Sequence, residues 1–384
     1  GAVSVYNKLE SRIGANAELA RRKHTLYLGQ GDLKRAEKEL TALIAAQPKQ
    51  LNHRHLLAGF YTSQGEEAKA RKVYQEILSI QPADVRAQLA LQEVQADRPA
   101  TAGGDDELLQ LLARTDVDID LKIGKILPLV QQVAQAKDNG ARSTGSVEPG
   151  PQDAGLGQRA MQLAAELRRV HPDEAKAAAM QGDLFFHTGQ LTKAAEAYRA
   201  TLELDDTVYP VWEQLLATLY LDNQITELRK YAEEALDIFP NRPVIYVQYA
   251  LGEALRANFG EANSLLDQAR IMVSSQPEAA IQLETLSSAF ASLEAGTPNG
   301  RLNMSHLPGG ADSPLGFLLQ NGGNAAALKA YDSPGNTNAL FLELLGDALK
   351  NSGDKAAAAS AYGRAKASGS KSTALRRKMT ETGS

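Results

Sequence analysis

The chain has 384 residues, 43% hydrophobic and 23% charged, with a formal net charge of −5. An acidic balance of this size gives no general attraction to nucleic acid or to an anionic membrane. The absence of cysteine excludes disulfides, thiolate metal sites and cysteine nucleophiles. No apolar run approaches the roughly 18 to 20 residues of a membrane span, so we expect no membrane insertion by this chain. One compact core of this length is unusual, which favours several domains or a repeat array.

Residues 1–137 are expected to form a first array of helical hairpins, led by a capping helix over residues 3–14. Two units then repeat with a period of 34 residues. The matching pairs are Tyr27/Tyr61, Gly31/Gly65, Ala36/Ala70 and Pro48/Pro82. In each unit the Gly suits the turn that ends the first helix, and the Pro prevents the second helix from continuing. Further helices are expected over 85–95, 105–113 and 119–137, with a break at 99–104.

Residues 138–157 are rich in Gly, Pro and Ser and are expected to form a mobile linker before a central array over 158–295. The same period returns between residues 175 and 240. Gly182 and Ala194 are expected where two helices cross closely, and Trp212 is expected to be an interior plug between units.

The pattern fails over residues 296–323, which hold three Pro and many Gly. An irregular segment is expected there, with one short helix over 314–320 capped by Ser313. Residues 324–384 are expected to form a last hairpin and a polar capping helix over 372–379.

The period, with an aromatic residue and Gly in the first helix, Ala in the second and Pro at the end, resembles the tetratricopeptide repeat (TPR). The resemblance implies an all-α fold, an α-α superhelix in two arrays with a Gly/Pro-rich hinge. A sheet of three or more strands would contradict this interpretation.

No set of residues typical of a catalytic, cofactor or metal site is found. His53 and His55 lie two positions apart, so on a helix they point away from each other and cannot share a metal. Asp116, Asp118 and Asp120 start like a calcium loop, but the Gly and Glu that should follow are Leu121 and Leu127. Residues 369–373 imitate the end of a phosphate loop without its spacing. The sequence therefore predicts no enzyme, no cofactor and no metal.

In TPR arrays the concave groove is built from positions 2, 5, 9 and 12 or 13 of each first helix. These positions hold Arg21, Thr25, His55 and Thr62 in the first array, and Lys176, Asp183, Phe186, His187, Glu213 and Tyr220 in the second. Aromatic side chains beside charges suit an amphipathic helix or an extended peptide from a protein partner. The alternative is that Phe186 and Tyr220 simply pack between repeats. The carboxylate clamp for chaperone tails is not predicted, because Thr25 and Leu56 stand where it needs Asn.

The arrangement also resembles a family of large TPR lipoproteins of Bacteroidetes bacteria. The resemblance is carried by residues 118–123, 171–176 with 182–183, 212–216 with 239–240, and 344–348. It implies export and attachment through an N-terminal lipid, in the periplasm or outer membrane, with no established activity. We therefore expect a non-enzymatic protein-binding scaffold in the cell envelope. Two alternatives remain open: a cytoplasmic regulatory or assembly-chaperone module, and an envelope polysaccharide-binding protein.

Overall fold

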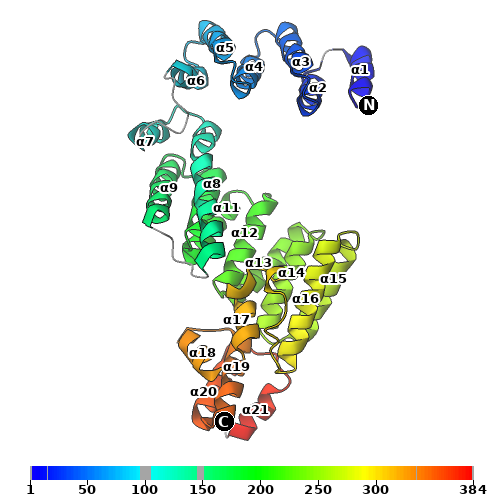
Figure 1. The fold of residues 1–384 in the computed structure, drawn as a ribbon, viewed down its shortest axis with the longest axis vertical. Helices are drawn as coiled ribbons and strands as arrows, with labels where there is room; N and C mark the ends of the chain where they lie inside the picture. The colour runs from blue at the N-terminus through cyan, green and yellow to red at the C-terminus, as the bar shows by residue number, and fades with distance from the viewer. Residues whose placement is uncertain (1, 15, 96–104, 145–150, 334, 383–384) are drawn as a thin grey trace. The chain divides into compact units, whose positions relative to one another are not determined.

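A computed structural model describes residues 2–14, 16–95, 105–144, 151–333 and 335–382 (Figure 1). Within these ranges every regular element is a helix, which confirms the predicted all-α class. The chain divides into two compact units, Gly1–Pro128 and Leu129–Ser384, called unit 1 and unit 2 below.

Unit 1 begins with a leading helix, continues with two helical hairpins and ends with three further helices. Its helices are α1 (Ala2–Ile13), α2 (Ala17–Gly29), α3 (Leu33–Ala46), α4 (Leu51–Ser63), α5 (Glu67–Ile80), α6 (Val85–Gln95), α7 (Asp105–Ala113) and the first part of α8 (Ile119–Thr144). Figure 1 shows α2, α4 and α6 on one side of the row and α3 and α5 on the other. The predicted break at 99–104 lies outside the described residues.

Turn and capping residues account for the hairpin boundaries in unit 1. Gly31 and Gly65 have φ of 72° and 71°, a left-handed conformation that glycine adopts without a steric penalty. Asn16 accepts hydrogen bonds from the Glu18 and Leu19 amides and so caps α2. Asp32 accepts from the Arg35 amide and caps α3 in the same way. The second helices bury their apolar residues against the first helices and form one core, which includes Ala36, Leu40, Ala70 and Ile77.

Unit 2 contains four helical hairpins and a series of shorter elements. Its helices are α9 (Pro151–Val170), α10 (Ala175–His187), α11 (Leu191–Leu204), α12 (Tyr209–Leu221), α13 (Ile225–Ile238), α14 (Pro243–Leu255), α15 (Phe259–Met272), α16 (Pro277–Glu294), α17 (Pro314–Asn321), α18 (Ala325–Tyr331), α19 (Ala339–Asn351), α20 (Lys355–Ala367) and α21 (Leu375–Thr382), with the 3-10 helices η1 (Met304–His306) and η2 (Gly310–Asp312) before α17. The hairpins are α10/α11, α12/α13, α14/α15 and α19/α20.

The linker predicted over 138–157 is helical wherever the structure describes it. Helix α8 continues to Thr144, and α9 already begins at Pro151, a residue suited to the first turn of a helix. The remaining predicted linker residues, 145–150, lie outside the described ranges. The division between the units falls earlier, at Pro128 inside α8. A proline lacks the amide that the helix ladder needs, so it is a natural point for such a division.

In two hairpins of unit 2, the first helix contacts the second through the same arrangement of a glycine, an aspartate and a tyrosine. A Cβ on Gly182 in α10 would lie 2.6 Å from Cε1 of Tyr198 in α11, so only glycine lets the ring pass. The Tyr198 hydroxyl donates to Asp183 Oδ1 at 2.8 Å. In α19/α20, Gly346, Asp347 and Tyr362 repeat this arrangement, with a hydroxyl-to-carboxylate distance of 2.7 Å.

The prediction that Trp212 is an interior plug is confirmed. Its side chain is 4% exposed, and its Nε1 donates to the Asp206 carbonyl oxygen at 2.7 Å. The indole therefore ties α12 to the loop that precedes it, and its ring lies in the main core of unit 2.

Candidate functional site

The exposed side of α4 carries residues at helical spacing that no other helix covers. Asn52, Leu56, Gly59 and Thr62 are exposed, whereas Leu57 and its neighbours on the opposite side are buried. Helices α2 and α6 lie on the same side of unit 1 as α4 (Figure 1). We group exposed residues of these three helices as the first-helix face of unit 1, made of Arg21, Thr25, Asn52, Leu56, Gly59, Thr62 and Arg86.

Two arginines of this face have no partner among the described residues. The side chains of Arg21 in α2 and Arg86 in α6 are exposed and form neither a hydrogen bond nor an ion pair there. Exposed lysines on the second helices, such as Lys34, Lys38 and Lys72, form no ion pair among the described residues either, whereas several other cations of unit 1 are paired. The basic groups of Arg22, Lys23 and Arg35 lie within 2.9 Å of carboxylates, and Lys23 contacts two of them. The first-helix face therefore presents positive charge that the fold does not use.

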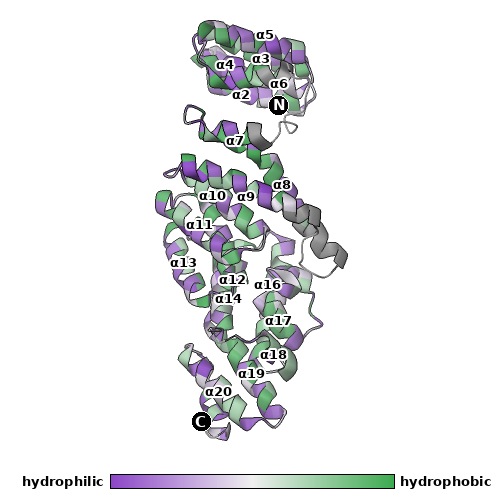
Figure 2. Ribbon diagram, turned by 90° about the vertical axis from the view of Figure 1, so that its left-hand side faces the viewer, coloured by the Kyte–Doolittle hydropathy of each residue, from purple (hydrophilic) through white to green (hydrophobic). Residues whose placement is uncertain are grey.

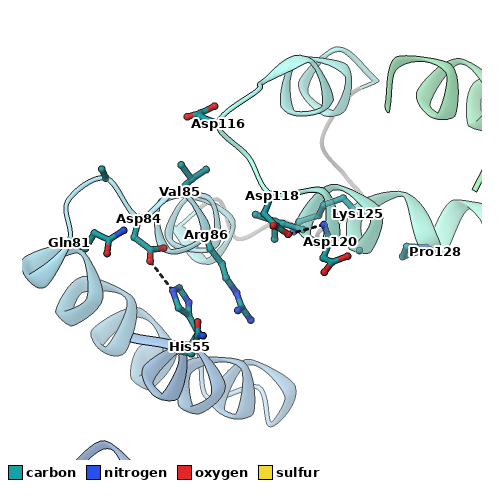
Figure 3. A pocket seen from close by; sticks show the side chains of 14 residues that line it. His55, Gln81, Asp84, Val85, Arg86, Asp116, Asp118, Asp120, Lys125 and Pro128 are labelled. Carbon is teal, nitrogen blue, oxygen red and sulfur yellow. Dashed lines mark hydrogen bonds and ion pairs between the residues drawn. The ribbon is translucent and has the colours of Figure 1, made fainter. Parts of the chain in front are cut away.

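His55 was predicted to line the binding groove, but its side chain is buried beneath the first-helix face. Its side chain is 4% exposed, and Nε2 lies 3.0 Å from Asp84 Oδ2 (Figure 3). The other oxygen of Asp84 accepts from the Ala87 amide at 2.8 Å and so caps α6. His55 thus fastens α4 to the start of the next repeat. His53 is buried as well, and burial followed by the charge of Arg21 lowers its pKa.

A cavity of about 950 Å³ adjoins the first-helix face within unit 1. Figure 3 shows Arg86 reaching from α6 into the open space beside His55. The opposite wall carries three aspartates. Asp116 pairs with Arg114 at 2.7 Å, and Asp118 accepts from the Asp120 amide at the start of α8. Among the described residues no group of three or more His, Asp or Glu is placed to hold a metal ion.

Tyr220 of unit 2, predicted to anchor a partner, is covered by the chain itself. Its side chain is 1% exposed, and its hydroxyl accepts from the Leu315 amide at 3.3 Å. Burial raises the pKa of this phenol to about 12. Gly309 lies against Leu221, since a Cβ there would come within 2.5 Å of Leu221 Cδ2. The alternative that Tyr220 packs internally is therefore correct, although its contact comes from residues 309–315 as well as from neighbouring repeats.

The corresponding side of α14 is buried as well. Leu251, Ala254 and Leu255 are 0% exposed. Four leucines between residues 302 and 320 share one core with α12 and α14 and are at most 4% exposed: Leu307, Leu315, Leu318 and Leu319. Ser313 accepts from the Gly316 amide at 3.1 Å and starts α17 as predicted. In Figures 1 and 2, α17 lies between α16 and α19. We call residues 302–320 the covering segment.

The remaining residues predicted for the second groove have different surroundings. Asp183 is half-buried and bonded to Tyr198, and burial raises the pKa of its carboxyl. Glu213 accepts from the Tyr209 hydroxyl one turn earlier in the same helix. Phe186 and His187 are half-buried with their rings 5.5 Å apart, and Lys176 is exposed. The two carboxylates are thus bonded by tyrosines of their own hairpin or helix.

Sequence reasoning missed four members of the first-helix face: Asn52, Leu56, Gly59 and Arg86. The register provides a signal for three of them, since Asn52 and Gly59 occupy positions 2 and 9 of their repeat and Arg86 occupies position 2 of the next. It offers none for the covering segment, which contacts α12 from 95 residues away in the chain.

Both units are built from helical hairpins stacked in sequence, which defines an α-α solenoid. Tetratricopeptide-repeat family models match residues 27–94 and 152–208. The chain therefore contains tetratricopeptide repeats in both units. Among the described helices, none combines the length and the apolar character that a membrane span requires.

Several solved TPR structures are similar to this chain. One is YrrB, described as a TPR protein with an unusual peptide-binding site (13% identity, 62% of this chain and 92% of that one, TM-score 0.31). A TPR protein from Parabacteroides merdae is 12% identical, covering 96% of this chain and 98% of that one, with a TM-score of 0.30. The TPR2AB domain of yeast Sti1, in complex with pHSP90, is 12% identical, covering 72% of this chain and 100% of that one, with a TM-score of 0.29. A search of curated proteins found no match.

Proposed function

We propose that this chain is a non-enzymatic scaffold that binds a peptide or helix of a protein partner on the first-helix face of unit 1. TPR arrays serve in general as protein-interaction modules, and their first helices line the concave side. The observation that supports the proposal most directly is that Arg21 and Arg86, exposed on this face, form no hydrogen bond or ion pair among the described residues. Unused charge on an interface acts through steering and specificity.

Two further observations favour unit 1 over the second predicted groove. The covering segment already occupies the side of α12 where Tyr220 would meet a partner, and Leu251 at the corresponding position of α14 is 0% exposed. In unit 1 the corresponding side of α4 is exposed from Asn52 to Thr62. The histidines there are committed to structure, since His53 is bonded to Gln47 and His55 to Asp84.

Site-specific photo-crosslinking in cells tests the proposal. A photoreactive side chain at Thr25 or Thr62 would lie on the first-helix face, and one at Lys72 would lie on the exposed side of a second helix. We expect adducts of the same mass from Thr25 and Thr62 and none from Lys72. Equal adducts at all three positions, or none at Thr25 and Thr62, would contradict the proposal.

Attachment to the cell envelope stays a prediction that depends on the resemblance to Bacteroidetes lipoproteins. Fractionation of the native cells separates it from the cytoplasmic alternative. A lipid-anchored protein is released from membranes by detergent and not by salt, because its acyl chains remain in the bilayer. Recovery in the soluble cytoplasmic fraction would favour the assembly-chaperone alternative.

A further inference from the structure

We infer that unit 2 carries a separate binding site, a polar pocket that takes a neutral mono- or disaccharide. The pocket has a volume of about 400 Å³ and lies between the turn that joins α12 to α13 and the loop before α19. Six lining residues supply its chemistry: Asp222, Asn223, Gln224, Tyr331, Asn336 and Thr337. This site lies outside the first-helix face and does not depend on the proposed function.

The turn at this pocket differs from the equivalent turns of the other hairpins. Asn223 has a φ of 56°, in the left-handed region that glycine adopts without a steric penalty. The corresponding residue is glycine or alanine in five other hairpins: Gly31, Gly65, Gly189, Ala257 and Gly353. Asn223 Nδ2 donates to Asn336 Oδ1 at 3.3 Å, and Asn223 Oδ1 accepts from Asn338 Nδ2 at 3.0 Å. The asparagine thus gives this turn a side-chain amide that fixes the facing loop against it.

Hydrogen bonds behind the lining hold its other polar groups in place. Gln224 Nε2 donates to Asp222 Oδ2 at 2.6 Å, and the Thr192 hydroxyl donates to the same oxygen at 2.9 Å. Arg199 donates to Gln224 Oε1 at 3.0 Å. A ligand would therefore meet side chains that are already ordered, which lowers the entropy cost of binding.

The lining keeps hydrogen-bonding groups that the fold does not use. Four of them have no partner among the described residues: Asp222 Oδ1, Asn336 Nδ2 and the hydroxyls of Tyr331 and Thr337. A carboxylate oxygen accepts hydrogen bonds, an amide NH₂ donates them, and a hydroxyl does both. Each hydroxyl of a sugar also donates and accepts, so adjacent hydroxyls on one ring can satisfy donors and acceptors that stand side by side. The unused groups are therefore complementary to a saccharide.

Tyr331 adds the apolar contact that a sugar ring needs. Its side chain is 47% exposed, although Phe317 stacks on it with 4.1 Å between the ring centroids. This stacking holds the phenol in a fixed orientation at the pocket. The face of an aromatic ring is negative and attracts C–H groups, which a pyranose ring presents. An exposed aromatic ring beside ordered polar groups is thus suited to a saccharide.

The lining disfavours ligands of other classes. Its described residues include no Lys, Arg or His and one carboxylate, so a phosphate would find no cation there and would be repelled by Asp222. An apolar ligand needs a mostly apolar pocket, whereas Tyr331 is the single aromatic residue among those described in the lining. The volume lies near the lower end of the range of about 300 to 1,000 Å³ for small-molecule sites, which suits one or two sugar rings.

Isothermal titration calorimetry of the full chain tests the inference. The probes are glucose, galactose, mannose, N-acetylglucosamine, maltose and cellobiose. Adenine and a neutral acetylated triglycine amide serve as polar ligands of other classes. We expect at least one saccharide to bind at a single site per chain, and neither adenine nor the peptide to bind.

Two conservative variants place this binding in the pocket. Tyr331→Phe and Thr337→Val remove hydroxyls that the fold does not use, so each should weaken the saccharide about fivefold, the effect of losing one hydrogen bond, without changing the Tm. Tyr231→Phe and Thr373→Val are the matched controls and should bind as wild type. Their hydroxyls also have no partner among the described residues, and they lie outside the lining.

Absence of binding by every saccharide would overturn the inference, and so would wild-type affinity in both Tyr331→Phe and Thr337→Val. Binding of adenine or of the peptide that these two variants weaken would assign the pocket to another class of ligand and would contradict the inference as well. The crosslinks at Thr25 and Thr62 report the scaffold independently, so either proposal can fail alone.

Discussion

Replacing glycine by alanine should have opposite effects at two positions of this chain. At Gly182 the added methyl would lie 2.6 and 2.7 Å from Cε1 and Cδ1 of Tyr198, closer than carbon atoms can approach. Tyr198 is 1% exposed and its hydroxyl is held by Asp183, so the ring cannot move without breaking other contacts. At Gly59 the same methyl would contact nothing within 4 Å.

The magnitudes follow from two opposing terms. Alanine favours the helix by about 1 kcal/mol over glycine at either position. Forcing an extra methyl into a packed site typically costs about 1 to 3 kcal/mol. Gly59→Ala should therefore stabilise unit 1 by about 1 kcal/mol, and Gly182→Ala should destabilise unit 2 by up to about 2 kcal/mol.

The assay is thermal and urea unfolding of the two variants against wild type. Trp212, the sole tryptophan, lies in α12 beside the affected hairpin, so its fluorescence reports unit 2. Amide exchange of α4 reports unit 1, and circular dichroism reports the helices of both units. For units of this size about 1 kcal/mol corresponds to a Tm change of roughly 2 to 4 °C. If Gly182→Ala raised the Tm as Gly59→Ala does, the close crossing of α10 and α11 would be refuted.

Three more substitutions test the packing of unit 2. Trp212→Ala should cost about 3 to 5 kcal/mol in urea unfolding, and an unmoved transition would show that the indole is not buried. Tyr220→Phe leaves the buried Leu315 amide without its acceptor, so the free energy of unfolding should fall by about 1 to 3 kcal/mol. The Leu315 amide should also exchange faster with solvent. An unchanged exchange rate would contradict the contact. Burial raises the pKa of Asp183 above its usual 3.8, so the folded state favours the protonated acid and loses stability as pH rises from about 4 through the raised pKa. Asp183→Asn keeps the oxygen that accepts from Tyr198 and cannot ionise. The free energy of unfolding of this variant relative to wild type should therefore rise across that pH interval and then stay constant. A difference in free energy that does not change with pH would contradict the assigned burial.

Most of the fold could be predicted from the sequence because its signals are local. The 34-residue period places the hairpins, Gly31 and Gly65 mark turns, and Ser313 with Pro314 marks the start of α17. The linker prediction was wrong over 138–144 and 151–157 because Gly and Ser lower helix propensity without preventing a helix.

The site was less predictable because burial of a repeat position depends on distant residues. His55 occupies a groove position, yet Asp84 from the next repeat draws its ring inward. Tyr220 occupies another, and the covering segment closes over it. The repeat pattern around His55 and Tyr220 gives no indication of Asp84 or of the covering segment, which bury them. The register alone could assign Asn52, Gly59 and Arg86 to the first-helix face, but their exposure could be established only from the structure.

The long-range contacts of unit 2 have a consequence for how the protein unfolds. In a simple solenoid each repeat touches only its neighbours, so the array can lose repeats one at a time from an end. Unit 1 fits this description, since its hydrogen bonds between repeats, such as His55 to Asp84, join residues near in sequence. In unit 2 the Lys371 amide donates to the Arg256 carbonyl, and Asn338 bonds Asn223. These bonds join α12 and α14 to the final hairpin, so that hairpin cannot detach without breaking contacts to the middle of the array. Unit 2 should therefore unfold in one cooperative step and protect its amides evenly, whereas unit 1 should exchange progressively from α1 inward.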